Sequence, residues 1–415
     1  MRILLALLVA WTVLAPAVVR AQTVPLAALV DEALARNPEI AAAERQYDAA
    51  LQRPPQERSL PDPMVGVGYT SAGNPLPGAG LGSEPGANIG VEVTQEIPYP
   101  GKLERRAAIA TKDAEAQRQQ IEAVRLRVVS RVKQAYFGLA FTYAAEDVLS
   151  RSRELLETLL QVSESRYAVG GAAQQDVFKA QAELSVIELR QEQIRSERGL
   201  RESELNALLN RAPGTPIGRP EPLALQPFEF TLDALVAAAR VRSPMLRREQ
   251  AMVERGELAV DAVRREYKPD FAVTGGYFNQ GSMPSMYMFR FDVVLPLRRA
   301  RRAAAVAEQQ LLLASARQTY DAARLDLEAR VQADYRMAAT ARRTARLYEA
   351  TVLPQTRLAF ESSMSGYQTG AIDFLSLLTN VTSILDFEMS YFEELTSFLT
   401  AASRLEEMTG LPLVR

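Results

Sequence analysis

The stretch NIGVEVTQEIPYPGKLERRAAIA, residues 88–110, changes its periodicity at the prolines near its middle. Before Pro98, apolar and polar residues alternate, which is the pattern of a strand with two different faces. After Gly101, the residues are charged or alanine-rich, which favours a helix. A related stretch, PLRRARRAAAVA at residues 296–307, also follows an alternating segment and precedes a helical one. The sequence therefore predicts two exits from a strand into an arginine-rich helix start.

Basic residues at a helix start oppose the helix dipole, so they need a partner outside their own helix. If the strands cross a membrane, these helix starts lie at the depth of the lipid phosphates. We therefore predict that the basic residues of both exits bind lipid head groups: Lys102, Arg105, Arg106, Arg301 and Arg302. A solvated basic turn is the alternative, because charge runs usually have no further role.

Similar segments recur in the same order in both halves of the chain. LVDEALARNPEI from Leu29 resembles LVAAARVRSPML from Leu235, and PDPMVGVGY from Pro61 resembles PDFAVTGGY from Pro269. RLRVVSRVKQAY resembles RLDLEARVQADY, and YAVGG resembles YQTGA. The order predicts a tandem duplication. The expected segments are a signal peptide at 1–21, a first repeat at 22–210, a proline-rich linker at 211–230 and a second repeat at 231–415.

Composition narrows the class of protein. Arg2 and the apolar run after it read as a secretory signal peptide. The chain has no cysteine and no histidine, and its net charge of -2 gives no argument for nucleic acid. No catalytic imidazole, thiol or ordinary zinc site can be formed, so we expect neither an enzyme nor a cofactor. Three methionines near the second pair of strands are interpreted as residues for loop packing or lipid contact rather than as ligands for a soft metal: Met283, Met286 and Met288.

The alternating segments predict two strands in each half. Apolar residues such as Val91 and Phe289 fall on one face, and polar residues fall on the other. A soluble half-buried sheet would alternate in the same way. Four strands cannot close a membrane barrel, so a membrane role requires several copies of the chain. A barrel formed by three copies would enclose a lumen. On the inner face we expect four charged residues to set the charge selectivity of the pore: Glu92, Glu96, Arg290 and Asp292.

The remainder of each half predicts a long helical hairpin. No proline occurs from about residue 101 to residue 168, and a helix of that length would extend for roughly 100 Å. A returning segment with heptad spacing follows each glycine turn, which indicates two antiparallel coiled coils. The segments therefore predict membrane strands in each half that continue into long antiparallel coiled-coil helices, which together describe a duct.

These motifs together resemble the TolC-like outer membrane efflux protein family, the outer membrane factors. The resemblance is carried by ALARNPEI, by PDP before a strand, by QEIPYPGK and by a YxxG turn followed by DVFKAQAEL. IPYPGK is most similar to the heavy-metal and cation efflux branch. The resemblance implies a homotrimer with a mixed fold, in which a twelve-stranded membrane β-barrel is combined with an α-helical barrel, located in the outer membrane of a Gram-negative bacterium. It also implies a large periplasmic portion, a periplasmic adaptor (membrane fusion protein) and an inner-membrane transporter as partners.

The resemblance also places the periplasmic entrance at the helix tips. Asp176 and Tyr367 match family residues and are expected to hydrogen-bond across the tips, although Asp176 could instead cap its helix. The family's arginine is replaced by Ile372, so Asp373 is a candidate substitute. The implied tip and gating residues are Tyr167, Gly170, Asp176, Tyr367, Gly370, Asp373 and Ser376.

The leading functional interpretation is a passive outer membrane exit duct for efflux. Type I protein secretion is the alternative for the same duct. A periplasmic coiled-coil adaptor or scaffold without a pore is the alternative of a different class.

Overall fold

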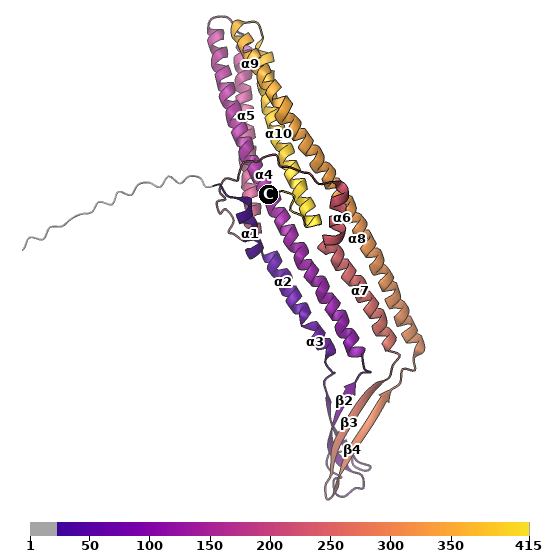
Figure 1. Ribbon diagram of the computed structural model, residues 1–415. Coiled ribbons are helices and arrows are strands. Elements are labelled where there is room, and N and C mark those ends of the chain that lie inside the picture. The colour runs from indigo at the N-terminus through magenta and orange to yellow at the C-terminus, as the bar shows by residue number, and fades with distance from the viewer. Residues whose placement is uncertain (1–22, 415) are drawn as a thin grey trace, which may run out of the picture. The chain divides into compact units, whose positions relative to one another are not determined.

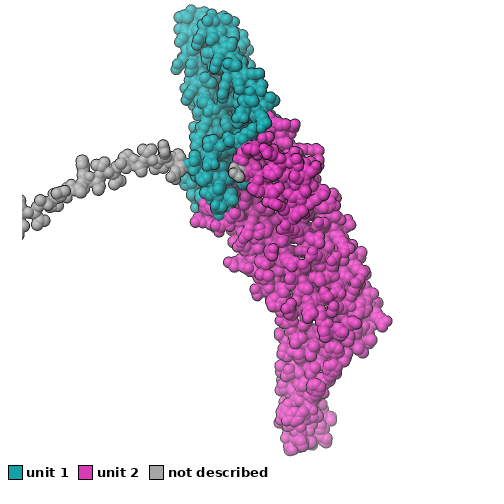
Figure 2. All heavy atoms as spheres, viewed as in Figure 1, with its two compact units in different colours: residues 1–31, 133–225, 344–396 teal, residues 32–132, 226–343, 397–415 magenta. Residues whose placement is uncertain are grey.

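The structure is a computed structural model that describes residues 23–414. The predicted signal peptide lies outside the described residues. The chain forms two compact units, which are coloured separately in Figure 2. Of the described residues, unit 1 comprises 23–31, Lys133–Leu225 and Thr344–Thr396, and unit 2 comprises Glu32–Val132, Gln226–Arg343 and 397–414. Among the described residues, no helix is both long enough and apolar enough to span a bilayer.

Unit 2 contains a four-stranded antiparallel sheet in the order β1-β2-β3-β4, seen at one end of Figure 1. The strands are β1 (Met64–Thr70), β2 (Asn88–Ile97), β3 (Asp270–Gln280) and β4 (Met283–Val294). Val65 pairs with Val93, and Val91 pairs with Tyr277. Tyr277 in turn pairs with Tyr287 of β4. The register therefore places most of the valine, isoleucine, tyrosine and phenylalanine side chains of the four strands on one face, as the alternation predicts, whereas Phe278, Met286 and Met288 fall on the other.

That apolar face is exposed in the chain. Phe289 is 78% exposed, although it is a large apolar residue. The other exposed members of this face are Val65, Val67, Ile89, Val91, Val93, Ile97, Tyr277, Tyr287, Phe291 and Val293. A contiguous exposed apolar surface of this kind marks an interaction site with a membrane or a protein.

The helical part of unit 2 is built on helices with recognisable starts. α2 (Pro38–Leu51) begins with a proline at its first turn, and the Asn37 side chain accepts a hydrogen bond from the Glu39 amide at 2.8 Å. Short α3 (Arg53–Arg58) follows α2. α6 (Leu232–Arg242) is capped by Thr231, and α7 (Pro244–Arg265) again has a proline at its start. Helix α1 (Leu26–Arg36) crosses the division between the units.

Unit 1 contains two helical hairpins that Figure 1 shows side by side. The first joins the later part of α4 (Lys102–Ala168) to α5 (Gln174–Leu208). The second joins the end of α8 (Arg299–Leu347), η1 (Tyr348–Val352) and α9 (Leu353–Thr369) to α10 (Phe374–Thr409). Their shared core includes Leu149, Leu156, Leu159, Ala180, Ile187, Tyr367, Leu377 and Val381. The apolar seam between the hairpins is what stabilises helices of this length.

The segment between the repeats is extended and held by specific contacts. In unit 1, Val24 forms a parallel bridge with Pro220. The Tyr136 hydroxyl donates to the Val24 carbonyl and accepts from the Glu221 amide, both at 2.9 Å. Burial raises the pKa of Tyr136, so its hydroxyl stays protonated and continues to donate at neutral pH.

Candidate functional site

The polar face of the sheet holds the four charged residues expected to line a pore. The register aligns Thr94, Thr274 and Arg290 in one row, and Thr94 and Thr274 hydrogen-bond through their hydroxyls at 2.9 Å. The next row contains Glu96, Ala272 and Asp292. The Arg290 Nε atom donates to Asp292 at 2.9 Å. Glu92 lies on the same face, opposite Gly66 and Gly276. Small and charged side chains therefore share this face.

Near the β3–β4 hairpin, the face that carries the charged residues becomes apolar. Phe278 lies over Gly90 and Gly276, where an added Cβ would approach its ring to within 2.7 Å. Met286 pairs with Phe278, and Met288 pairs with Gly276, so both methionines lie on the face that carries Arg290 and Asp292. No group of three or more acidic side chains suited to a metal ion occurs among residues 23–414.

At the first strand exit, the structure corrects the expectation for Lys102. Its side chain is 2% exposed, and the ammonium contacts Asp270 at 2.9 Å and Glu266 at 3.1 Å. It also donates to the Lys268 carbonyl at 3.2 Å. A buried ammonium needs such partners, because an unpaired buried charge is very costly. Lys102 is therefore a structural residue inside unit 2 and is not available to a lipid phosphate.

The neighbouring arginines also have partners within unit 2. Arg105 pairs with Asp261 at 3.0 Å, and Arg106 pairs with Glu266 at 3.5 Å. At the second exit, Arg302 donates to the Glu266 backbone carbonyl at 2.7 Å. Glu266 is the C-terminal cap of α7, where the helix dipole is negative. The C-terminal end of α7 therefore supplies the partner that the basic helix starts require.

Arg301 differs from the other four residues. It is exposed, and among the described residues no hydrogen bond or ion pair involves its side chain. Of the predicted head-group ligands, Arg301 thus has the guanidinium that is most available to a phosphate.

The two hairpin turns are closed by glycines in the left-handed region, with φ of 75° at Gly170 and 82° at Gly370. Such a residue after a helix end is a common C-terminal cap. The tyrosines before them have different surroundings, because Tyr167 is 47% exposed and Tyr367 is 3% exposed.

The expected hydrogen bond between Asp176 and Tyr367 is absent from the described chain. The Tyr367 hydroxyl contacts the Ser163 hydroxyl at 3.3 Å. Ser163 already donates to the Leu159 carbonyl at 2.9 Å, so Tyr367 is the donor to Ser163. Asp176 lies in the first turn of α5, whose cap position is Ala173. The N-cap alternative for Asp176 is therefore also wrong, although its charge suits the helix dipole there.

Asp373 caps the N-terminus of α10. Its carboxylate accepts from the Ser376 amide at 2.8 Å and from the Ser376 hydroxyl at 3.0 Å. These hydrogen bonds lower the pKa of Asp373. Within the chain, both Asp373 and Ser376 are thus engaged in a helix cap.

Sequence reasoning missed two charged residues of the hairpins. Arg166 contacts the Gly171 carbonyl of the first turn, and both the carbonyl and the ring of Tyr367 near the end of α9. Glu388 is bound by Arg151 of α4 and Arg357 of α9. A comparison of the two halves could have revealed Arg166. The tyrosine and the turn glycine after it recur in the second half, but Gly366 stands at the position that matches Arg166.

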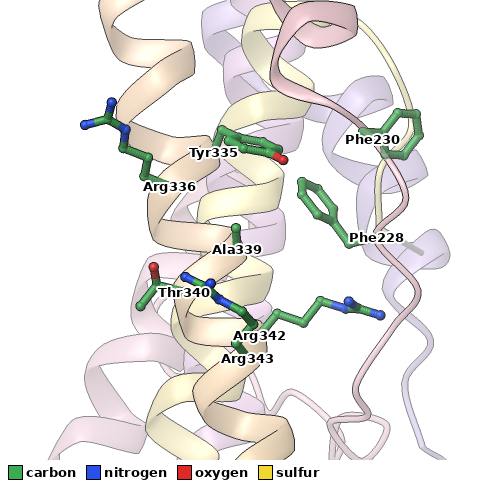
Figure 3. Close-up of a pocket in the computed structure, with 8 residues that line it drawn as sticks. All are labelled: Phe228, Phe230, Tyr335, Arg336, Ala339, Thr340, Arg342 and Arg343. Carbon is green, nitrogen blue, oxygen red and sulfur yellow. The ribbon is translucent and has the colours of Figure 1, made fainter.

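Figure 3 shows a cavity of about 600 Å³ in unit 2. Phe228 and Tyr335 point toward each other there, with ring centroids 6.0 Å apart. The remaining lining residues are Phe230, Arg336, Ala339, Thr340, Arg342 and Arg343. No carboxylate lines this cavity, so it lacks the paired acid and base groups of a hydrolytic site.

An exposed apolar sheet face and long helical hairpins are features expected of a membrane protein of mixed strand and helix architecture. The chain belongs to the outer membrane efflux protein family, whose sequence profile matches residues 29–211 and 235–411. The family consists of passive outer membrane channels rather than enzymes. The protein is accordingly located in the outer membrane.

Solved structures with the same fold support this assignment. The chain is 17% identical to the outer membrane protein VceC from Vibrio cholerae, with a TM-score of 0.77 over 93% of this chain and 96% of that one. A membrane protein from Pseudomonas aeruginosa is 18% identical, with a TM-score of 0.78 over 93% of each chain. The CmeC outer membrane channel from Campylobacter jejuni is 16% identical, with a TM-score of 0.76 over 93% and 85%. No curated protein sequence matches the chain.

Proposed function

We propose that three copies of this chain form the outer membrane exit duct of a tripartite efflux system. The observation that carries the proposal is the four-stranded sheet, whose outer strands β1 and β4 have no further partner strand within the described residues. Open edges are normally covered or paired. Four strands are also too few for a membrane barrel, since the smallest has eight. Three copies would supply twelve strands and a lumen.

In this assembly the exposed apolar face contacts lipid and the charged face lines the lumen. β2, β3 and β4 have 10, 11 and 12 residues, which matches the length of a tilted membrane strand. Glu92, Glu96, Arg290 and Asp292 then face the permeating solute and influence its charge preference. The entrance lies at the hairpin turns in the periplasm.

The proposed partners are a periplasmic adaptor and an inner-membrane transporter. Family members are trimeric channels that work with such proteins. The IPYPGK motif supports a heavy-metal or cation pump as the transporter. Type I protein secretion remains the alternative use of the same duct.

Reconstitution tests the duct with a pair of adjacent substitutions. Phe289→Arg places a charge on the apolar face, where an arginine at mid-bilayer depth costs about 2–4 kcal/mol. Met288→Arg places the same charge on the opposite face. We expect Phe289→Arg to reduce the heat-sensitive oligomer on gels. Met288→Arg should assemble normally and shift the ion selectivity of the planar-bilayer conductance toward anions.

The opposite result would refute the duct. A mature chain that is monomeric and water-soluble without detergent, and that gives no conductance, would instead favour a periplasmic adaptor or scaffold. Equal tolerance of both arginine substitutions would contradict the assignment of the two faces.

A further inference from the structure

Arg166 joins the two hairpin turns of one chain. It lies in the last turn of α4, and its Nη2 atom donates to the Gly171 carbonyl of the first turn at 3.1 Å. Its Nη1 atom donates to the Tyr367 carbonyl of the second hairpin. The guanidinium carbon also lies 4.6 Å from the centroid of the Tyr367 ring. One planar side chain thus makes two backbone hydrogen bonds and a cation–π contact across the turns.

The residue that Arg166 holds is itself fixed in the core. Tyr367 is 3% exposed and packs against Phe374 with ring centroids 5.9 Å apart. Its hydroxyl donates to Ser163, on the same helix as Arg166. The Tyr367 ring and carbonyl therefore offer Arg166 a rigid surface, which makes the contact sensitive to any separation of the hairpins.

The second repeat has no equivalent of this contact. Residues 163, 167 and 170 recur as the same residue types 200 positions later, but glycine stands at 366 in place of Arg166. A Cβ at Gly366 would approach the Ile372 side chain to 2.7 Å, so the Ile372 side chain occupies the space that a larger residue at position 366 would need. At Gly370, a Cβ would lie 3.5 Å from the Arg166 Nη2 atom. The arginine that joins the hairpins therefore comes from the first hairpin alone.

We propose that Arg166 is the positioning residue that latches the two hairpin tips and so sets how often the entrance opens. This inference rests on the proposed function, in which the turns form the entrance. The acceptors of both Arg166 hydrogen bonds are backbone carbonyls. The latch thus uses contacts within one chain that join its two hairpins.

Conductance and a distance measurement test the latch together. Arg166→Ala removes the hydrogen bonds and the ring contact, and we expect the open probability in planar bilayers to rise at least about fivefold. Arg166→Lys keeps the charge but loses the planar fork, so it should give an intermediate value. Arg195→Ala is the matched control, because Arg195 pairs with Glu192 of its own helix. It should leave the conductance unchanged.

Because the chain has no cysteine, spin labels can be placed without background. Val169→Cys and Gln368→Cys mark the two turns, and Val169 is 83% exposed. Labelled chains are diluted with unlabelled ones so that distances within one chain dominate. Arg166→Ala should broaden and lengthen the distance distribution, whereas Arg195→Ala should not.

Each outcome decides a different claim. An unchanged distance and an unchanged conductance in Arg166→Ala overturn the latch. Separated turns with wild-type conductance overturn its role at the entrance. A wild-type chain that never conducts contradicts the proposed function itself, while the distance measurement still reports whether Arg166 holds the turns together.

Discussion

The two halves of the chain have similar sequences but use their charged residues differently. At the first strand exit, Lys102 is buried between Glu266 and Asp270. At the second exit, Arg301 is exposed. Asp62, before β1, matches Asp270, the first residue of β3, because each follows a proline in the repeated Pro-Asp pair. Asp62 is nevertheless exposed, as Arg301 is. The acidic partners therefore come from the second repeat and are used by the first.

The hairpins show the same asymmetry. Glu188 and Glu388 occupy places 200 residues apart. The Glu188 side chain is 58% exposed and pairs with Arg153, whereas the Glu388 side chain is 9% exposed and binds two arginines. The two halves thus share a backbone plan, which depends on local periodicity. The charged contacts diverge because each depends on what packs beside it.

The largest expected effect comes from removing the acids around Lys102. Glu266→Gln combined with Asp270→Asn leaves a buried ammonium without a counter-ion, and we expect a loss of about 3–5 kcal/mol of unfolding free energy. The measurement is the thermal unfolding midpoint of the helical circular dichroism signal in detergent.

Asp62→Asn is the control for this experiment, because the same change is made at the matching place in the first repeat. It should alter the midpoint little, as expected for an exposed side chain. Equal midpoints for the double variant and the control would show that the Lys102 cluster does not stabilise the junction.

A smaller effect is expected at Glu388, and it depends on pH. Burial raises its pKa, but the hydrogen bonds from Arg357 and Arg151 lower it by more, so the net pKa lies below the usual value. A carboxylate whose pKa is lowered in the folded state stabilises the protein at pH values above its unfolded-state pKa. That contribution is lost as the pH falls through the folded-state pKa.

Glu388→Gln should therefore cost about 1–3 kcal/mol at neutral pH, and the difference from wild type should shrink below pH 4.5, the usual value. Glu188→Gln should change stability little at either pH, because exposed ion pairs contribute little. Unfolding midpoints measured at neutral and acidic pH test both variants. A Glu388→Gln penalty that persists in acid would contradict a role for the ionised carboxylate.

Local patterns predicted most of the fold, and long-range contacts account for what they missed. The alternation in residues 88–97 predicts β2 and its two faces, because side chains alternate along any strand. The turn glycines follow from backbone geometry. By contrast, Lys102 meets acids 164 and 168 positions away, and Tyr367 meets Ser163 at a separation of 204. No local pattern distinguishes a basic residue that binds lipid from one that is buried in an ion pair.

The smallest expected effect is a difference between the two strand exits in how strongly their arginines bind lipid. Arg301 is exposed and, unlike the also exposed Arg106, has no partner among the described residues. One arginine near an anionic membrane surface contributes about 1 kcal/mol to binding. We expect Arg301→Ala to weaken retention of anionic phospholipid about fivefold, measured by native mass spectrometry of the detergent-solubilised protein. Arg105→Ala is the control, because Arg105 is already paired with Asp261. If both variants retain lipid as the wild type does, the basic helix starts have only the protein partners described above.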